Sequence, residues 1–87
     1  MLVDFIAEAE EQISQSEAAY RANDCKGVQS ELHTLKGNSG TLGAAAVHAL
    51  CEGIEKKAKV CNFEHFETEI IELKNALNLF KSYVDTL

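Results

Sequence analysis

The clearest periodicity in the chain lies in residues 62–87, NFEHFETEIIELKNALNLFKSYVDTL. Its large apolar residues recur at alternating steps of three and four, which is the spacing of one face of an α-helix. The stripe consists of Phe63, Phe66, Ile70, Leu73, Leu77, Phe80, Val84 and Leu87. We expect Asn62 to cap this helix, with Cys61 and Phe66 placed to form a hydrophobic staple. A helix with so long an apolar stripe needs partner helices to cover it, so this stretch predicts a helical bundle.

Three earlier segments also have the apolar spacing of helices, and no stretch shows the sustained alternation of a strand. The first helix is expected over residues 2–21, with an apolar face made of Leu2, Phe5, Ile6, Ala9, Ile13 and Tyr20. The second is expected to follow the capping residue Asp24 and to end near Gly40. Thr41 is expected to cap the third, whose face of small and apolar residues consists of Leu42, Ala45, Ala46, Ala49, Leu50 and Ile54.

The connections between these segments are short, so neighbouring helices should be antiparallel. The predicted fold is all-α: an antiparallel up-down-up-down four-helix bundle that forms a single domain over residues 1–87. A coiled-coil dimer through residues 62–87 would bury the same apolar stripe, but packing within one chain does so at a lower entropic cost. A monomer is therefore expected.

Composition restricts the partners and the location. The 87 residues carry a formal net charge of −6, which argues against a nucleic-acid ligand because nucleic-acid phosphates require a basic surface. No apolar run is long enough to span a bilayer, and the N-terminus lacks the basic flank of a signal peptide. We therefore expect a soluble, cytoplasmic protein without membrane insertion, whose partners are other proteins.

The three cysteines, Cys25, Cys51 and Cys61, are expected to be buried or half-buried free thiols. Their number is odd and none belongs to a Cys-x-x-Cys pair, so neither a disulfide framework nor a structural zinc site is expected. His48 stands three residues before Cys51, a spacing that suits two ligands of one metal ion. Because two ligands are too few, we expect no metal site and predict that His48 is a surface or interhelical residue.

The segment HTLKGNSGTLG, residues 33–43, contains the residues of greatest chemical interest. In a helix, the apolar stripe of this region consists of Val28, Leu32, Leu35, Ser39 and Leu42. His33 lies about 120° from the centre of that stripe and should face solvent. Lys36 and Gly37, three and four positions further on, share its side of the helix. The pattern therefore predicts an exposed imidazole with a cation beside it and a missing side chain next to that cation.

An imidazole in these surroundings suits a phosphoryl acceptor. A histidine with its ordinary pKa is mostly neutral at pH 7, so one ring nitrogen has a lone pair that can attack phosphorus. Lys36 would disfavour a second positive charge on the ring and would pair with the phosphoryl oxygens after transfer. Glycine destabilises an exposed helix interior by roughly 0.5–1 kcal/mol relative to alanine, so Gly37 indicates that another backbone approaches closely. The residues themselves therefore predict a phosphorylatable histidine.

This segment resembles the His-x-x-Lys-Gly motif of the histidine-containing phosphotransfer (HPt) domains of two-component phosphorelays. His33, Lys36, Gly37, Ser39 and Gly43 occupy the places of that motif. The family's minimal unit is an antiparallel four-helix bundle of about this length, so the resemblance covers the whole chain. It implies a histidine phosphocarrier, in which His33 accepts a phosphoryl group from the aspartate of a response-regulator receiver domain and passes it to another receiver.

The resemblance also implies roles for neighbouring residues. Lys36 is the expected charge partner of the phosphate, and Glu55 matches a position, often glutamine in the family, that orients the imidazole; Glu52 and Lys56 are alternatives for that orienting role. The expected partner-docking residues are Gly37, Gly40 and Gln29. Magnesium would be supplied by the receiver domain. The chain is expected to hold no cofactor or metal of its own and to have no autonomous kinase activity.

Two other functions remain open from the sequence. One is a non-phosphorylated helical adaptor that binds a receiver or kinase domain, with His33 incidental. The other is a phosphodonor domain excised from a multidomain hybrid sensor histidine kinase, in which a separate kinase domain phosphorylates His33. Receiver binding without an acid-labile phosphate would favour the adaptor, whereas labelling by a kinase domain alone would favour the phosphodonor domain.

Overall fold

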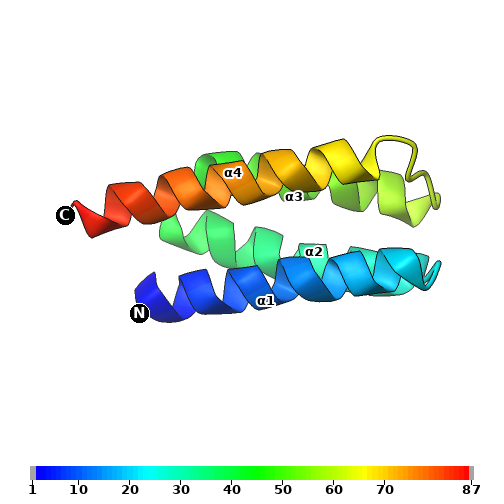
Figure 1. Cartoon of the computed structure of the whole chain (residues 1–87), viewed down its shortest axis with the longest axis horizontal. Helices are drawn as coiled ribbons and strands as arrows, with labels where there is room; N and C mark the ends of the chain where they lie inside the picture. The colour runs from blue at the N-terminus through cyan, green and yellow to red at the C-terminus, as the bar shows by residue number, and fades with distance from the viewer. Residues whose placement is uncertain (1, 87) are drawn as a thin grey trace.

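The computed structural model describes residues 2–86, with side chains from residue 4 onward. These residues form the helices α1 (Leu2–Arg21), α2 (Cys25–Leu42), α3 (Ala45–Lys59) and α4 (Phe66–Asp85). Helix directions alternate along a bundle of 39 × 19 × 18 Å, so the start of α1 and the end of α4 lie at the same end (Figure 1). Each helix packs against two others, α2 against α1 and α3, and α4 against α3 and α1. The predicted all-α, up-down-up-down four-helix bundle is confirmed.

The apolar stripes predicted for α1 and α4 lie in the core as expected. On α1, the buried members are Phe5, Ile6, Ala9 and Ile13, and Tyr20 is partly buried. On α4, the buried members are Phe66, Ile70, Leu73 and Leu77, Phe80 is partly buried against them, and Val84 is half-buried. Phe63, also partly buried against the core, lies in the loop before α4. Leu87 and the side chain of Leu2 lie outside the described part of the chain.

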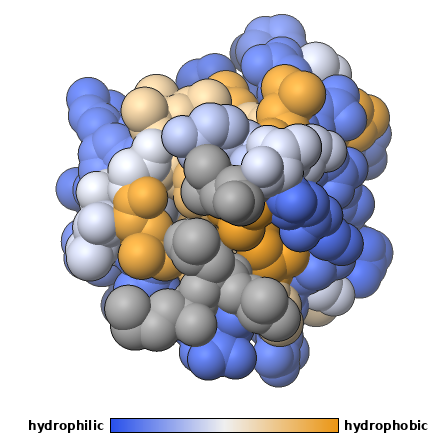
Figure 2. All heavy atoms as spheres, turned by 90° about the vertical axis from the view of Figure 1, so that its left-hand side faces the viewer, coloured by the Kyte–Doolittle hydropathy of each residue, from blue (hydrophilic) through white to orange (hydrophobic). Residues whose placement is uncertain are grey.

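Aromatic and other hydrophobic side chains are found at both ends of the bundle. At the end opposite the termini, Tyr20 of α1 stacks on Phe66 of α4 with ring centroids 4.3 Å apart, and Phe63 meets both rings edge-on. At the end that carries the termini, hydrophobic side chains are visible near the centre of the surface, and most of its edge is hydrophilic (Figure 2).

Within residues 2–86, none of the helices combines the length and the apolar character needed to cross a bilayer.

Asp24 caps α2 as predicted, since its side chain accepts a hydrogen bond from the backbone N–H of Gly27 at 3.0 Å. The predicted end of α2 near Gly40 is two residues early, because α2 continues to Leu42. Gly43 then takes a left-handed conformation with φ of 78°, which glycine adopts at no steric cost, and ends the helix there.

Thr41 consequently does not cap α3. It lies in the last turn of α2, where its hydroxyl donates to the carbonyl of Gly37 at 3.1 Å. The residue before α3 is Ala44, which has no side chain able to cap.

The start of α4 also differs from the prediction. This helix begins at Phe66, and Asn62 instead stabilises the preceding loop by accepting a hydrogen bond from the backbone N–H of Glu64 at 3.2 Å. The predicted staple between Cys61 and Phe66 does not form, because these residues are separated by the loop and Cys61 is engaged elsewhere.

The predicted face of α3 is wrong in three of its six members, whereas Ile54 is buried and Leu42 and Leu50 are partly buried against the core. Ala45, Ala46 and Ala49 are exposed, whereas the buried residues of the helix are Val47, Cys51, Ile54, Glu55 and Ala58. The larger side chains of Val47 and Ile54 remove more apolar surface from water than the alanines would, so they decide which face of α3 turns inward.

The cysteine prediction is wrong for two residues and confirmed for the third. Cys25 and Cys61 form a disulfide with Cα atoms 5.5 Å apart, which joins the start of α2 to the loop after α3. Their separation of 36 residues gives no pairing signal in the sequence, but the antiparallel arrangement of α2 and α3 brings them together. Cys51 is a free, buried cysteine, and burial raises the pKa of its thiol to about 12.

Candidate functional site

His33 projects from α2 toward solvent, as its position on the helix predicts. The opposite face of α2 is anchored in the core by Val28, Leu32, Leu35 and Ser39. The hydroxyl of Ser39 donates to the carbonyl of Leu35 at 2.6 Å, so this polar member of the stripe is satisfied within its own helix. The side chain of His33 is 67% exposed. The fold therefore holds the backbone of His33 on a rigid helix while leaving its imidazole accessible.

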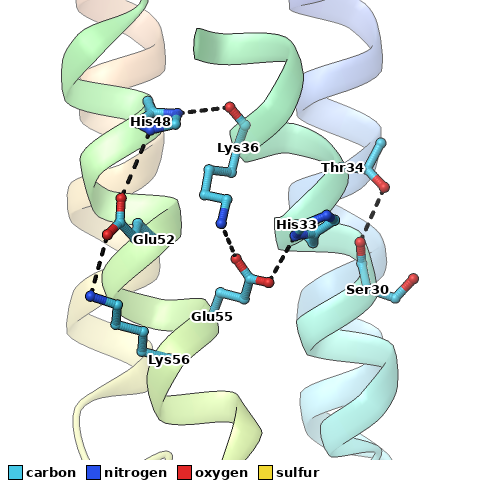
Figure 3. A network of polar contacts seen from close by, with 8 residues as sticks. All are labelled: Ser30, His33, Thr34, Lys36, His48, Glu52, Glu55 and Lys56. Carbon is cyan, nitrogen blue, oxygen red and sulfur yellow. Dashed lines mark hydrogen bonds and ion pairs between the residues drawn. The ribbon is translucent and has the colours of Figure 1, made fainter.

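A single carboxylate from α3 joins His33 and Lys36 (Figure 3). One oxygen of Glu55 lies 2.9 Å from Nδ1 of His33, and the other lies 2.8 Å from Nζ of Lys36. The Glu55 side chain is only 6% exposed, and these contacts use both of its oxygens. The structure thus brings together all three residues that were expected to carry the chemistry.

The contact with Glu55 sets the tautomer of His33. An ionised carboxylate only accepts hydrogen bonds, so Nδ1 must carry the hydrogen of this bond. In the neutral ring the lone pair then resides on Nε2, and no hydrogen bond to Nε2 is found among the described residues. The arrangement presents a nucleophilic nitrogen at the surface of the bundle.

The surroundings of Glu55 favour its ionised form. Burial is the largest single influence on this carboxyl group and opposes ionisation, but hydrogen bonds from Lys36 and His33, with their charges, lower the pKa of Glu55 below its ordinary value. The hydrogen bond to Glu55 raises the pKa of Lys36, against a smaller opposing effect of burial. Glu55 therefore carries a negative charge and Lys36 a positive charge at neutral pH.

A second polar network lies one turn away and includes the predicted interhelical histidine. His48 of α3 contacts the backbone carbonyl of Lys36 through Nδ1 at 2.9 Å, so Nδ1 donates (Figure 3). Its Nε2 lies 3.8 Å from Glu52, which also pairs with Lys56 at 3.3 Å. Glu52 thus contacts both His48 and Lys56, and the orienting position at His33 is occupied by Glu55.

The glycines predicted to admit a docking partner have different surroundings. A Cβ atom at Gly37 would have open space around it, consistent with room for an approaching molecule. A Cβ atom at Gly40 would lie 3.1 Å from Nδ1 of His48, so this glycine provides the space in which His48 reaches the carbonyl of Lys36. A role in packing within the chain is therefore evident for Gly40, and docking at either glycine stays a prediction.

A hollow of about 440 Å³ lies beside His33, between α2 and α3. Its lining residues are Lys26, Gln29, Ser30, His33, Thr34, Glu55 and Lys59. Gln29, expected in docking, therefore lies next to the imidazole. Lys26 and Ser30 were not identified from the sequence, although their spacing with His33 along one helix face is a signal that could have indicated them.

Bundle and site together define a class of protein: a small helical domain that presents one oriented histidine at its surface. A family model described as "Hpt domain" matches residues 1–83, which is nearly the whole chain. The chain belongs to the Hpt family, the histidine-containing phosphotransfer domains of phosphorelay systems, and its role is accordingly phosphotransfer in a phosphorelay. Hpt domains interact with receiver domains in these systems. Searches of curated proteins and of solved structures gave no significant match.

Proposed function

We propose that His33 is the phosphoacceptor, taking the phosphoryl group from the aspartate of a response-regulator receiver domain and passing it to the aspartate of another. The observation that carries this proposal is the contact between Nδ1 of His33 and Glu55, in a side chain that is otherwise largely exposed. That contact leaves Nε2 as the nucleophile and directs it away from the carboxylate. A monomeric state belongs to the same proposal.

The transfer step follows from this geometry. The lone pair of Nε2 forms a bond to phosphorus while the bond from phosphorus to the aspartyl oxygen of the receiver breaks, and the electron pair leaves on the receiver's carboxylate. The ring keeps the hydrogen on Nδ1 and becomes positively charged. Glu55, already bonded to that hydrogen at 2.9 Å, stabilises the charge as it develops. No proton has to move during the step, so no general base is needed.

Lys36 has two anionic partners in this proposal. In the unphosphorylated protein its ammonium binds Glu55 at 2.8 Å. After transfer, the phosphoryl oxygens arrive on the same face of α2, and Lys36 can neutralise part of their charge. It also reduces the repulsion between the phosphoryl group and Glu55, so one carboxylate can orient the ring without excluding the incoming anion. The magnesium ion that assists such transfers would be held by the receiver.

The proposal is tested by phosphotransfer from receiver domains charged with acetyl phosphate. Wild type should acquire an acid-labile, alkali-stable label, and His33→Gln should acquire none. At saturating receiver, Glu55→Gln should label about tenfold more slowly, because an amide accepts from Nδ1 but does not offset the charge on the ring. Glu52→Gln is the matched control, since Glu52 contacts His48 and Lys56, and should label at the wild-type rate.

Two results would count against the proposal. Label retained by His33→Gln would place the phosphate on another residue. Receiver binding without any label on wild type would instead favour the adaptor function.

A further inference from the structure

The hollow beside His33 has a cation on each of its two walls. Lys26 belongs to the first turns of α2 and Lys59 is the last residue of α3, and both line the same space as the imidazole. Both side chains are exposed. Glu55 is the acidic residue of the lining, and its two oxygens are already taken by His33 and Lys36.

These two lysines also differ from most other cations of the protein in their lack of ion pairs. Lys36, Lys56, Lys57 and Lys74 each bind a carboxylate, of Glu55, Glu52, Glu69 and Glu17 respectively. Among the described residues, no carboxylate lies within ion-pair distance of Lys26 or Lys59. In a chain with a formal net charge of −6, the hollow is thus a place where positive charge is left uncompensated next to the reactive histidine.

The disulfide fixes the backbone that carries both lysines. Cys25 immediately precedes Lys26, and Cys61 follows Lys59 by two residues. The covalent link therefore joins the two walls of the hollow at the positions from which the lysines extend. The distance between the backbones of Lys26 and Lys59 is therefore restrained by the disulfide as well as by packing.

We propose that Lys26 and Lys59 form a docking contact for the acidic rim of the partner receiver domain. The inference rests on the proposed function and deepens it by naming residues that select the partner. A receiver that carries a phosphorylated aspartate and holds magnesium with further carboxylates presents an anionic surface around the reacting group. Two uncompensated ammonium groups that line the same hollow as His33 attract that surface and raise the rate of productive encounter.

The test measures the second-order rate constant of transfer, with the acetyl-phosphate-charged receiver that labels wild type, over a series of salt concentrations. At low ionic strength, Lys26→Gln and Lys59→Gln should each lower this constant about three- to tenfold and flatten its dependence on salt. The labelling rate at saturating receiver should stay at the wild-type value, because neither lysine takes part in bond formation. Lys26→Arg and Lys59→Arg keep the charge and should keep most of the rate.

Lys81→Gln is the matched control, because Lys81 is an exposed lysine on α4 with no ion pair among the described residues. Its rate constant and salt dependence should equal those of wild type. If wild type transfers but the Lys26 and Lys59 variants behave as Lys81→Gln does, the docking contact is wrong while the phosphocarrier function stands. If no receiver labels wild type, both the function and the contact are overturned.

Discussion

Glu55 is the residue through which the site is organised. Its carboxylate comes from α3, whereas the two cations that it binds come from α2, so the ion pairs also link the two helices. The side chain is nearly buried, and an unpaired carboxylate there would be costly. Glu55 can therefore stay charged only while His33 and Lys36 remain in place, which couples the orientation of the imidazole to the packing of α2 on α3.

The lowered pKa of Glu55 predicts how stability depends on pH. A carboxyl group whose pKa is depressed on folding contributes stability above its ordinary pKa of 4.5, and this contribution is lost as the pH falls through the lower, folded value. The free energy of unfolding of wild type should exceed that of Glu55→Gln at neutral pH, and the difference should shrink below pH 4.5. Urea denaturation of both proteins across this range measures it.

At alkaline pH, the titration of Lys36 determines how the free energy of unfolding changes with pH. Its raised pKa means that the ion pair stabilises the fold below the ordinary lysine pKa of 10.5 and is lost as the pH rises through the folded value. A stability difference between wild type and Glu55→Gln that does not change at either end of the pH range would show that the ion pair does not form in solution.

At the scale of elements, Gly40 of α2 makes room for a hydrogen bond between α2 and α3. Gly40 lets His48 reach the carbonyl of Lys36, and this bond lies one turn from His33. Gly37, on the next turn back, has no neighbour that a side chain would meet. Substitutions at these two glycines therefore separate the effect of packing against His48, at Gly40, from the effect of an open surface, at Gly37.

Replacing each glycine by alanine should give different stabilities. Alanine gains roughly 0.5–1 kcal/mol of helix propensity over glycine, and Gly37→Ala should show this gain because its surroundings are open. Gly40→Ala should gain less or lose stability, since its methyl group would displace His48 from a hydrogen bond of about 1 kcal/mol. Urea denaturation measures both changes. A Gly40→Ala gain equal to that of Gly37→Ala would contradict the role assigned to His48.

The elements also show what the sequence could and could not predict. The α4 stripe and the exposure of His33 follow from large residues at helical spacing, which leaves one face for the core. The inward face of α3 was missed because alanines surround Val47 and Cys51 and make several faces nearly equivalent in apolar character. Helix starts were missed at Thr41 and Asn62, since a residue able to cap also serves inside a helix or in a loop.

Within the site, the sequence motif predicted His33 and Lys36 and placed Glu55 beside them, but not how the three are connected. The binding of both His33 and Lys36 by one carboxylate depends on the angle and register between α2 and α3. A local sequence pattern contains no information about that angle or register. The pairing of Cys25 with Cys61 depends on the same long-range register.

At the scale of the whole molecule, the disulfide is the strongest constraint on the unfolded chain. A link between residues 36 positions apart restricts the denatured ensemble and should stabilise the fold by about 3–4 kcal/mol. Urea denaturation with and without a thiol reductant should show a lower midpoint for the reduced protein. The Cys25→Ser, Cys61→Ser double variant should match the reduced protein and be insensitive to the reductant. Equal midpoints for oxidised and reduced wild type would contradict this prediction.

The same link gives the molecule an unusual covalent topology. Cys25 and Cys61 close a ring that contains all of α2 and α3, and with them both His33 and Glu55. The turn at Gly43 and Ala44 lies inside this ring. A protease that cut the chain at that turn would open the ring without releasing a fragment, so His33 and the Glu55 carboxylate that contacts it would remain parts of one covalent molecule.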